Sequence, residues 1–270
     1  MRILILCAGQ GTRLRPLTND RPKCLVPLLG KPLLDHQLDT IRRCGIDDVS
    51  LVTGYAADCL TSYGKRRFHN AEYAHTNMVV SMFRAAELFD GSDDLIVAYS
   101  DIVYESAVLE ALIASPSDIA TVIDDKWRLL WETRSDDPLS DAETLKLKAD
   151  GTLAEIGKKA TDIDEIQGQY IGLTKFARSV QNEILGLYED VRQKFTAAGR
   201  SADNMYMTDF LQSLIDANLP IGAAHVKGGW LEVDTLQDLA IYERIAGAGN
   251  LHQFWKPAAG EAEQAAREHS

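Results

Sequence analysis

The sequence predicts an α/β fold in which helices flank a mostly parallel mixed sheet and a strand-rich lobe is inserted late in the chain. Three observations support this prediction. Residues 3–8 form a continuous apolar run that ends at a glycine, as expected of a strand buried on both faces of a parallel sheet. Apolar runs and segments with helical spacing then alternate as far as residue 124. Residues 125–175 break this alternation and look strand-rich, with acidic turns.

The other strands are short apolar runs, and the helices are segments whose apolar residues recur every three or four positions, as Leu34, Leu38 and Ile41 do. In chain order we predict a strand at 3–8, a helix at 33–44, a strand at 49–53, a helix at 77–89, a strand at 95–99, a helix at 107–114, a strand at 119–123, helices at 177–198 and 209–217, strands at 220–226 and 230–233, and a helix at 235–246. We interpret residues 1–246 as one domain and residues 247–270 as a tail, with a docking point at Phe254 and Trp255.

Composition and charge exclude several classes of protein. Apolar residues make up 46% of the 270 positions, enough for a sizeable core, and the formal net charge is −12. Because a general nucleic-acid binder carries a basic face, nucleic acid is not an expected partner. The apolar run at 3–8 is too short to span a membrane and no signal peptide precedes it, so we expect a cytoplasmic protein. Cys7, Cys24, Cys44 and Cys59 form no CxxC pair, which argues against a zinc site or a disulfide framework.

The loop after the first strand carries the chemistry. It reads Gly9-Gln10-Gly11-Thr12-Arg13-Leu14-Arg15-Pro16-Leu17-Thr18 and continues as Arg21-Pro22-Lys23-Cys24-Leu25-Val26-Pro27. Open α/β sheets bind ligands at the carboxyl ends of their strands, where this loop begins. Glycines let the backbone approach phosphates closely, and Arg13 and Lys23 can add charge-assisted hydrogen bonds. The pattern therefore predicts a phosphate-binding loop.

Two rival phosphate-binding motifs fail on this loop. A dinucleotide fingerprint requires a third glycine at position 14, where the chain has Leu14, and Pro16 breaks the helix that this motif opens. This excludes a dinucleotide-dependent oxidoreductase. A P-loop requires Gly-Lys-Ser or Gly-Lys-Thr after its glycine spacing, and the loop lacks that sequence.

The complete string resembles the signature of the sugar-phosphate nucleotidyltransferase superfamily, G-x-G-[TS]-R-L-x-P-L-T followed by P-K-x-L-V-P. The resemblance covers residues 1–245. It implies a Rossmann-like sheet, a loop that wraps a triphosphate, and catalytic roles for Arg13 and Lys23, which would stabilise charge on the α-phosphate and pyrophosphate. The nucleotide-binding residues that it implies are Ala8, Gly9, Gly11, Thr12, Arg13, Lys23, Asn77, Ser81 and Asp101.

The resemblance also implies a Mg²⁺ site built from two carboxylates. Asp101 follows the apolar run 95–99, where the family has a magnesium-binding aspartate. Asp234 falls in the segment that supplies the second ligand, and Glu232 is the alternative. Without the family, such acids are more often helix caps or surface charges, and Asp234 with Thr235 could cap the helix that follows.

The acceptor is predicted from four further segments. Ile156-Gly157-Lys158-Lys159 stands where sugar enzymes carry Glu-Lys-Pro, whose acid holds sugar hydroxyls, so a sugar is disfavoured. Residues 76–78, 137–143 and 165–173 instead resemble the choline-phosphate cytidylyltransferase branch of bacteria. Aromatic faces and carboxylates bind an ammonium group, each cation–π contact contributing about 0.5–2 kcal/mol. The predicted acceptor-binding residues are Lys158 for the phosphate, Glu165 for the counter-charge, and Tyr170, Trp131 and Trp230 as aromatic walls, with Tyr206 and Asp209 as further candidates.

Together these features favour an enzyme that transfers CMP from CTP to a small phosphorylated amino-alcohol, such as phosphocholine, and releases pyrophosphate. The alternative acceptors are a sugar-1-phosphate, phosphoethanolamine or an aminophosphonate. A nucleotide-sensing module without turnover is the alternative of another class. Because Lys23, Asp101 and Asp234 are all present, an enzyme is favoured over such a module. Cytosine is implied by the family branch alone, and a homodimer is compatible with the sequence.

Overall fold

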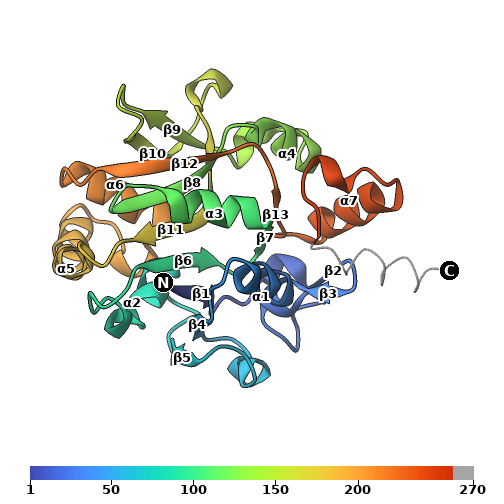
Figure 1. The fold of residues 1–270 in the computed structure, drawn as a ribbon, viewed down its shortest axis with the longest axis horizontal. Coiled ribbons are helices and arrows are strands. Elements are labelled where there is room, and N and C mark those ends of the chain that lie inside the picture. Colours follow the sequence, from blue (N-terminus) through green and yellow to red (C-terminus); the bar gives the residue numbers. More distant parts are fainter. Residues whose placement is uncertain (258–270) are drawn as a thin grey trace.

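The computed structural model describes residues 1–257 and is built around a seven-stranded sheet with the strand order β12-β8-β11-β6-β1-β4-β5 (Figure 1). Its strands are β1 Arg2–Cys7, β4 Asp48–Thr53, β5 Arg66–His69, β6 Leu95–Tyr99, β8 Ile119–Asp124, β11 Gln169–Phe176 and β12 Ile221–Val226. All neighbouring strands are parallel except β11, which runs antiparallel to both β6 and β8. The predicted α/β class with a mostly parallel mixed sheet is confirmed.

Strand β1 shows why the sheet has two cores. All six of its residues are buried, and their side chains alternate between the two faces. Ile3 and Ile5 belong to one hydrophobic cluster, whereas Leu4 and Leu6 belong to the other. A strand buried in this way reads as a continuous apolar run, which is why residues 3–8 were recognisable from the sequence.

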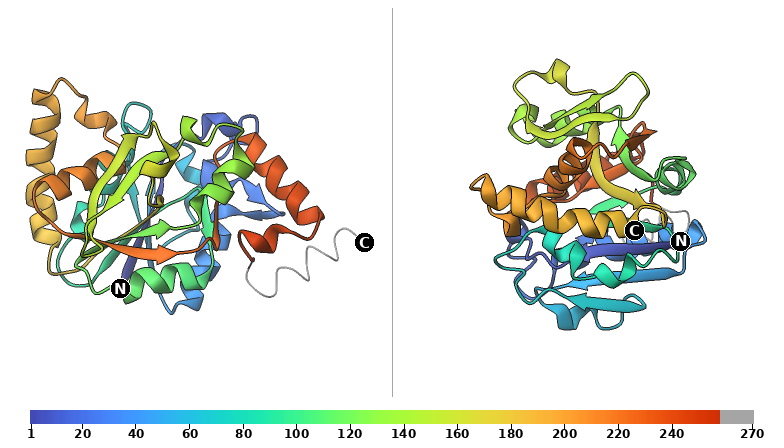
Figure 2. Two further views of the ribbon diagram at one scale, coloured as in Figure 1. Left: turned by 90° about the horizontal axis from the view of Figure 1, so that it is seen from above. Right: turned by 90° about the vertical axis from the view of Figure 1, so that its left-hand side faces the viewer.

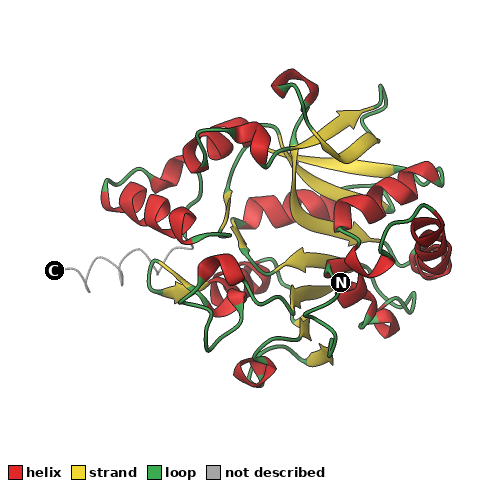
Figure 3. Ribbon diagram, turned by 180° about the vertical axis from the view of Figure 1, so that it is seen from behind, coloured by secondary structure: helices red, strands yellow, loops and turns green. Residues whose placement is uncertain are grey.

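Helices cover both faces of the sheet. The first cluster includes buried residues of α1 Leu33–Arg43, α3 Ser106–Ala114, α4 Trp127–Arg134 and α7 Leu236–Gly247, and the second those of α2 Met78–Phe83, α5 Gln181–Ala197 and α6 Met207–Asp216. Figure 3 shows the same arrangement from behind. The predicted helix at 77–89 is split, because Ala85 leaves helical geometry with φ −101° and ψ 30°, and a short 3-10 turn follows.

Three small sheets accompany the main one. They pair β2 Pro27–Leu28 with β3 Lys31–Pro32, β7 Ile102–Tyr104 with β13 Trp230–Glu232, and β9 Glu143–Leu147 with β10 Leu153–Lys159. The β9–β10 hairpin stands away from the main sheet in the right-hand view of Figure 2. It forms the inserted lobe together with α4. Helix α4 corrects the expectation that this whole stretch is strand-rich, since Trp127, Leu130 and Trp131 are buried at helical spacing.

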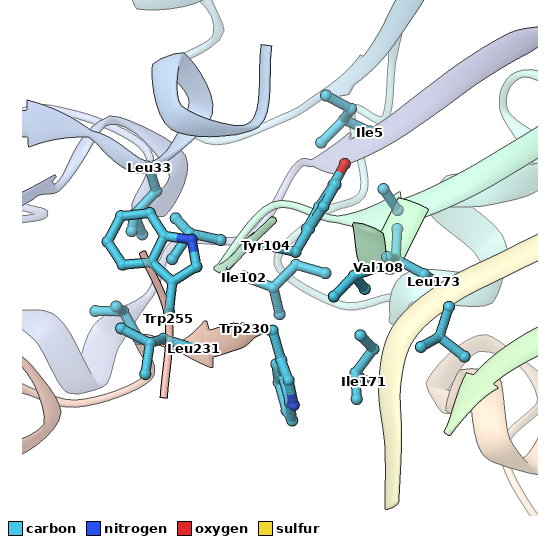
Figure 4. Packing of buried hydrophobic residues seen from close by; sticks show 14 of the residues in the cluster. Ile5, Leu33, Ile102, Tyr104, Val108, Ile171, Leu173, Trp230, Leu231 and Trp255 are labelled. Atoms are coloured by element: carbon cyan, nitrogen blue, oxygen red, sulfur yellow. The ribbon is translucent and has the colours of Figure 1, made fainter. Parts of the chain in front are cut away.

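The last described residues fold back onto the core. Leu251 and Trp255 are buried, and the Trp255 ring meets His36 edge-on with 5.2 Å between ring centroids. Figure 4 shows Trp255 beside Leu33 and Leu231. Trp255 is therefore anchored where the sequence suggested a docking point, while residues 258–270 of the predicted tail lie outside the described residues. Within residues 1–257, no helix is both long and apolar enough to cross a bilayer.

Candidate active site

A large cavity opens at the carboxyl ends of β1 and β6, where the phosphate-binding loop begins. It brings together most of the residues predicted from the sequence. The predicted residues that line it are Ala8, Gly9, Gly11, Thr12, Arg13, Lys23, Asn77, Ser81, Asp101, Trp131, Tyr170, Tyr206, Trp230 and Asp234. Residues separated by more than two hundred positions in the chain thus share one cavity.

Gly11 and Lys23 fix the shape of the phosphate-binding loop. Gly11 has φ +60°, and a Cβ atom there would lie 2.8 Å from the Cβ of Lys23. Only glycine allows this approach without strain, so the two ends of the loop can close together. Thr18 holds the closure by donating its hydroxyl to the Gly11 carbonyl at 2.9 Å. The neighbouring Cys24 is fully buried and anchors the Lys23 segment to the core.

Lys23 joins the two carboxylates predicted to bind magnesium. Its Nζ donates to Asp101 Oδ2 at 2.7 Å and to Asp234 Oδ1 at 2.6 Å. Arg13 contacts the other Asp234 oxygen at 2.5 Å from the opening of the cavity, where its side chain is 66% exposed. Burial opposes the charge of Lys23, but Asp101 and Asp234 outweigh it and raise the pKa of the ammonium. Lys23 is therefore a fixed cation at the centre of the cavity.

The carboxylates of Asp101 and Asp234 fit a Mg²⁺ ion. Their oxygens already share one cation, the Lys23 ammonium, and Asp101 Oδ1 is buried without a hydrogen-bond partner. Within residues 1–257, no three His, Cys, Asp or Glu side chains gather as a complete protein cage. Mg²⁺ is commonly held by one or two carboxylates together with water and substrate phosphates.

Both aspartates are held by buried polar contacts that the sequence analysis missed. Gln37 of α1 donates its amide to the carbonyls of Tyr99 at 3.0 Å and Ile102 at 2.8 Å, on either side of Asp101. The backbone carbonyl of Asp101 accepts from Val233 N at 2.8 Å, which ties the two carboxylate-bearing segments together. Thr235 and Asp238 cap α7 reciprocally, so Asp234 itself is free of the capping role considered from sequence.

Glu232, the alternative metal ligand, also lines the cavity but faces a different partner. Its carboxylate accepts from Arg134 Nη1 at 2.6 Å, and the same guanidinium contacts Asp238. Burial raises the pKa of Glu232, Arg134 opposes that rise, and the nearby Asp101 adds to it. Glu232 is therefore paired with Arg134, whereas Asp234 is the carboxylate that shares Lys23 with Asp101.

One wall of the cavity is neutral and polar. We call it the neutral wall, and it comprises Tyr73, Thr76, Asn77, Met78 and Ser81. Asn77 caps α2 by accepting from Met78 N at 2.8 Å, as the sequence suggested. Asn70, a fully buried residue not identified from sequence, donates its amide to both Thr76 Oγ1 and Ser81 Oγ.

A second group of lining residues is acidic and aromatic. We call it the acidic wall, and it comprises Trp131, Asp141, Glu143, Gln169, Tyr170, Tyr206 and Thr208. Burial raises the pKa of Glu143, and the hydroxyl of Thr208, 3.4 Å away, opposes that rise. Among the described residues that line the cavity, the lysines and arginines are Lys23 and Arg13 alone. The acidic wall thus presents carboxylates and aromatic rings to whatever binds there.

Three predicted acceptor residues lie outside the cavity, and a fourth, Trp230, lines it but is almost fully buried. Trp230 is only 2% exposed, and its indole donates to Asp124 at 2.9 Å, so it supports Trp131 from behind, with 6.0 Å between the rings. Lys158 is 62% exposed and pairs with Glu155, and Glu165 pairs with Lys146, both outside the cavity. Asp209 caps α6 and pairs with Arg200. The bend of β10 at Gly157, where φ is +84°, directs this strand toward Thr208 and leaves Lys158 in solvent.

Comparisons with known proteins show what this chain is similar to. Residues 3–196 match the family model described as a MobA-like NTP transferase domain. The CTP:phosphoglutamine cytidylyltransferase of Campylobacter jejuni is 38% identical over 250 residues, which cover 89% of this chain and 98% of that protein. The choline-phosphate cytidylyltransferase of Streptococcus pneumoniae is 37% identical over 91 residues, 32% of this chain and 40% of that protein.

The solved structures that resemble this chain share its fold. The CTP:phosphocholine cytidylyltransferase of Streptococcus pneumoniae superposes with a TM-score of 0.66 at 22% identity, covering 91% of this chain and 98% of that one. The inositol-1-phosphate CTP transferase of T. maritima gives a TM-score of 0.69 at 16% identity, covering 94% and 97%.

Proposed function

Since this chain belongs to the MobA-like NTP transferase family, we propose that it transfers CMP from CTP to a small phosphorylated acceptor that carries a cationic amine, phosphocholine being the model case. The observation that carries this proposal is the charge difference between the two walls of the cavity. The phosphate-binding loop and Lys23 share one cavity with the neutral wall and the acidic wall. Two relatives named as cytidylyltransferases support CTP as the donor.

The two walls suit the two substrates. A nucleobase is uncharged and presents hydrogen-bonding edges, so hydroxyl and amide groups such as those of Ser81 and Asn77 are suited to it. An ammonium group is attracted to carboxylates and aromatic faces, which Glu143, Trp131 and Tyr170 supply. In this arrangement the triphosphate lies along the loop, with the base toward the neutral wall and the acceptor toward the acidic wall.

The chemistry needs positioning and charge neutralisation rather than a protein nucleophile. An oxygen of the acceptor phosphate, already ionised at neutral pH, attacks the α-phosphorus in line, and the bond to pyrophosphate breaks. Lys23 and Arg13 offset the negative charge that develops on the α-phosphate and the leaving group. Lys23 is held charged by Asp101 and Asp234, so it needs no proton during the reaction. Gly9 and Gly11 admit the phosphates to the backbone amides.

Asp101 and Asp234 are the residues that would hold Mg²⁺. The ion would supply Lewis-acid stabilisation of phosphate charge when bound there. Asp101 offers its unpartnered Oδ1, and Gln37 keeps the turn around Asp101 in place. The segment of Asp234 is fixed to Asp238 of α7 through its own backbone amide at 2.9 Å.

The acid that holds sugar hydroxyls in the sugar enzymes of the superfamily has no counterpart here. Sugar enzymes of the superfamily carry an acid at the position of Gly157, and here a Cβ at that position would lie 2.6 Å from the Cβ of Thr208. An acidic side chain cannot stand there unless α6 moves. The close packing of β10 against α6 therefore explains why position 157 carries no acid.

A second candidate acceptor is phosphoglutamine. The relative with this acceptor in its name is covered over 98% of its length, including the lobe with the acidic wall. Glutamine also carries an ammonium group for Glu143, but it adds a carboxylate that the acidic wall, which has no lysine or arginine among its described lining residues, would not neutralise. This difference favours an acceptor without a free carboxylate.

The test is an acceptor panel with each of the four common NTPs, following pyrophosphate release with Mg²⁺ present. The panel contains phosphocholine, phosphoethanolamine, phosphoglutamine, an aminophosphonate and glucose-1-phosphate. We expect turnover with CTP and a cationic acceptor, and least with glucose-1-phosphate. Turnover with a sugar phosphate and no cationic acceptor would overturn the acceptor class, and turnover with another NTP but not CTP would overturn the base.

A further inference from the structure

Asn70 lies directly after β5 and is fully buried, with a side chain whose orientation is fixed by its partners. Its Oδ1 accepts the backbone N–H of Glu72 at 3.1 Å. Because a backbone amide can only donate, the oxygen must be on that side and the NH₂ group must face the other way. The Asn70 NH₂ group is therefore an obligate donor toward the neutral wall.

That NH₂ group meets two hydroxyls. It donates to Thr76 Oγ1 at 2.9 Å and to Ser81 Oγ at 3.0 Å. Thr76 gives its own proton to the Glu72 carbonyl at 2.9 Å, so both of its hydrogen-bonding roles are filled within the protein. Ser81 is different, because no acceptor in the described part of the chain takes its proton.

We infer that Asn70 is a positioning residue for base selection: by occupying the oxygen of Ser81 as a donor, it turns the Ser81 hydroxyl proton toward the nucleobase. The inference rests on the proposed function, in which the neutral wall receives the base. Ser81 is 95% buried and lines this wall, so its proton either meets the ligand or stays without a partner. A buried donor left without an acceptor is costly.

A hydroxyl fixed as a donor distinguishes cytosine from uracil. Cytosine offers an unprotonated ring nitrogen, N3, as an acceptor, whereas uracil has an N–H at the same position. If that edge faces Ser81, CTP accepts the proton and UTP brings a second donor to it. Binding of UTP would then require the Ser81 proton to turn away from the ligand, where the described residues provide no acceptor.

The test is Asn70→Asp, which keeps the shape and the bond from the Glu72 amide but replaces the NH₂ group with an acceptor oxygen. Ser81 would then donate to the carboxylate and present a lone pair to the base. We expect the ratio of the CTP and UTP dissociation constants, measured by calorimetry without acceptor, to shift toward UTP by at least about tenfold. An Asn70→Asp protein whose affinities for CTP and UTP change equally would overturn the inference.

Two further variants keep the inference falsifiable. Ser81→Ala removes the donor and should lower CTP preference by itself, even if Asn70→Asp does not fold. The double variant should match Ser81→Ala in CTP to UTP ratio, because Asn70 acts through Ser81. A Ser81→Ala protein with unchanged selectivity would overturn the inference. Because these are binding measurements, they stand apart from the acceptor panel, whose failure would concern the transfer reaction.

Discussion

Arg134 and Asp238 lie side by side, with Arg134 Nε donating to Oδ1 at 2.9 Å and Nη2 to Oδ2 at 3.4 Å. Both side chains are less than a tenth exposed. The third nitrogen of Arg134 contacts Glu232, and Asp238 also accepts the amides of Asp234 and Thr235. One arginine on α4 thus connects the acidic wall with the segment that carries a proposed metal ligand.

Arg134→Met should destabilise the protein strongly, because it leaves two buried carboxylates without their cation. Removing one partner of a buried ion pair costs about 3–5 kcal/mol. Urea unfolding would measure this loss. The matched control is Arg128→Met on the same helix, whose pair with Glu132 is exposed and should contribute little. Equal losses for the two variants would contradict a structural role for the Arg134 network.

Lys23→Ala should lower turnover by about 10²–10³-fold while the protein stays folded, because the central cation of the cavity is lost. Pyrophosphate release under saturating CTP would measure the effect. Arg21→Ala in the same loop is the control, since Arg21 pairs with Asp20 outside the cavity. A folded Lys23→Ala protein that turns over normally would remove Lys23 from the mechanism.

Gly11→Ala should impair turnover at least about tenfold, because its Cβ would push Lys23 out of position. The left-handed conformation of residue 11 adds strain of about 1–2 kcal/mol. Gly30→Ala separates the two effects, because Gly30 has φ +81° but open space around its missing Cβ. Both variants should lose stability in thermal melts, and only Gly11→Ala should lose activity. Comparable activity in the two would mean that contact with Lys23 is unimportant.

Glu143→Gln should weaken acceptor binding and stabilise the protein at neutral pH. Burial raises the pKa of Glu143, so its ionisation costs folding free energy above that raised pKa. Below the ordinary carboxyl pKa of about 4.3 the cost vanishes, because the side chain is protonated in both folded and unfolded states. The gain in Tm should therefore be largest near pH 8 and shrink toward pH 5.

The same variant should raise the KM of a cationic acceptor about tenfold, a loss of about 1.4 kcal/mol. Glu132→Gln, on the exposed face of α4, is the control for charge alone. An unchanged KM together with the predicted gain in stability would keep Glu143 as a buried acid but remove it from acceptor binding.

The strands that are apolar runs and the phosphate-binding loop were predictable because their signals are local, whereas β5, Arg66–His69, has no apolar run and was not predicted. Buried strands read as apolar runs, and the loop is one continuous string. Helix α4 also had a local signal in the spacing of Trp127, Leu130 and Trp131, which the acidic turns nearby obscured. The predictions for Lys158 and Glu165 were made from the segments 156–159 and 165–173, and nothing in the first segment shows that β10 bends at Gly157.

The buried polar residues were not predictable for a different reason. Gln37 binds carbonyls more than sixty residues away, and Arg134 binds acids about one hundred residues away. Asn70 contacts residues close in sequence, but its role depends on the complete burial of its side chain, which no apolar pattern predicts. Such residues are recognised only once the sheet has brought their partners together.

The antiparallel strand β11 divides the sheet into two sets of parallel strands, with β6, β1, β4 and β5 on one side and β8 and β12 on the other. The first set of strands bears the phosphate-binding loop, Asp101 and the neutral wall. The β9–β10 hairpin follows β8 of the second set in the chain and leads into β11. Most of the acidic wall, from Trp131 to Tyr170, thus comes from one contiguous segment between α4 and β11, and Tyr206 and Thr208 join it from the start of α6. Under the proposed function, the donor and the acceptor would therefore contact largely different stretches of the chain.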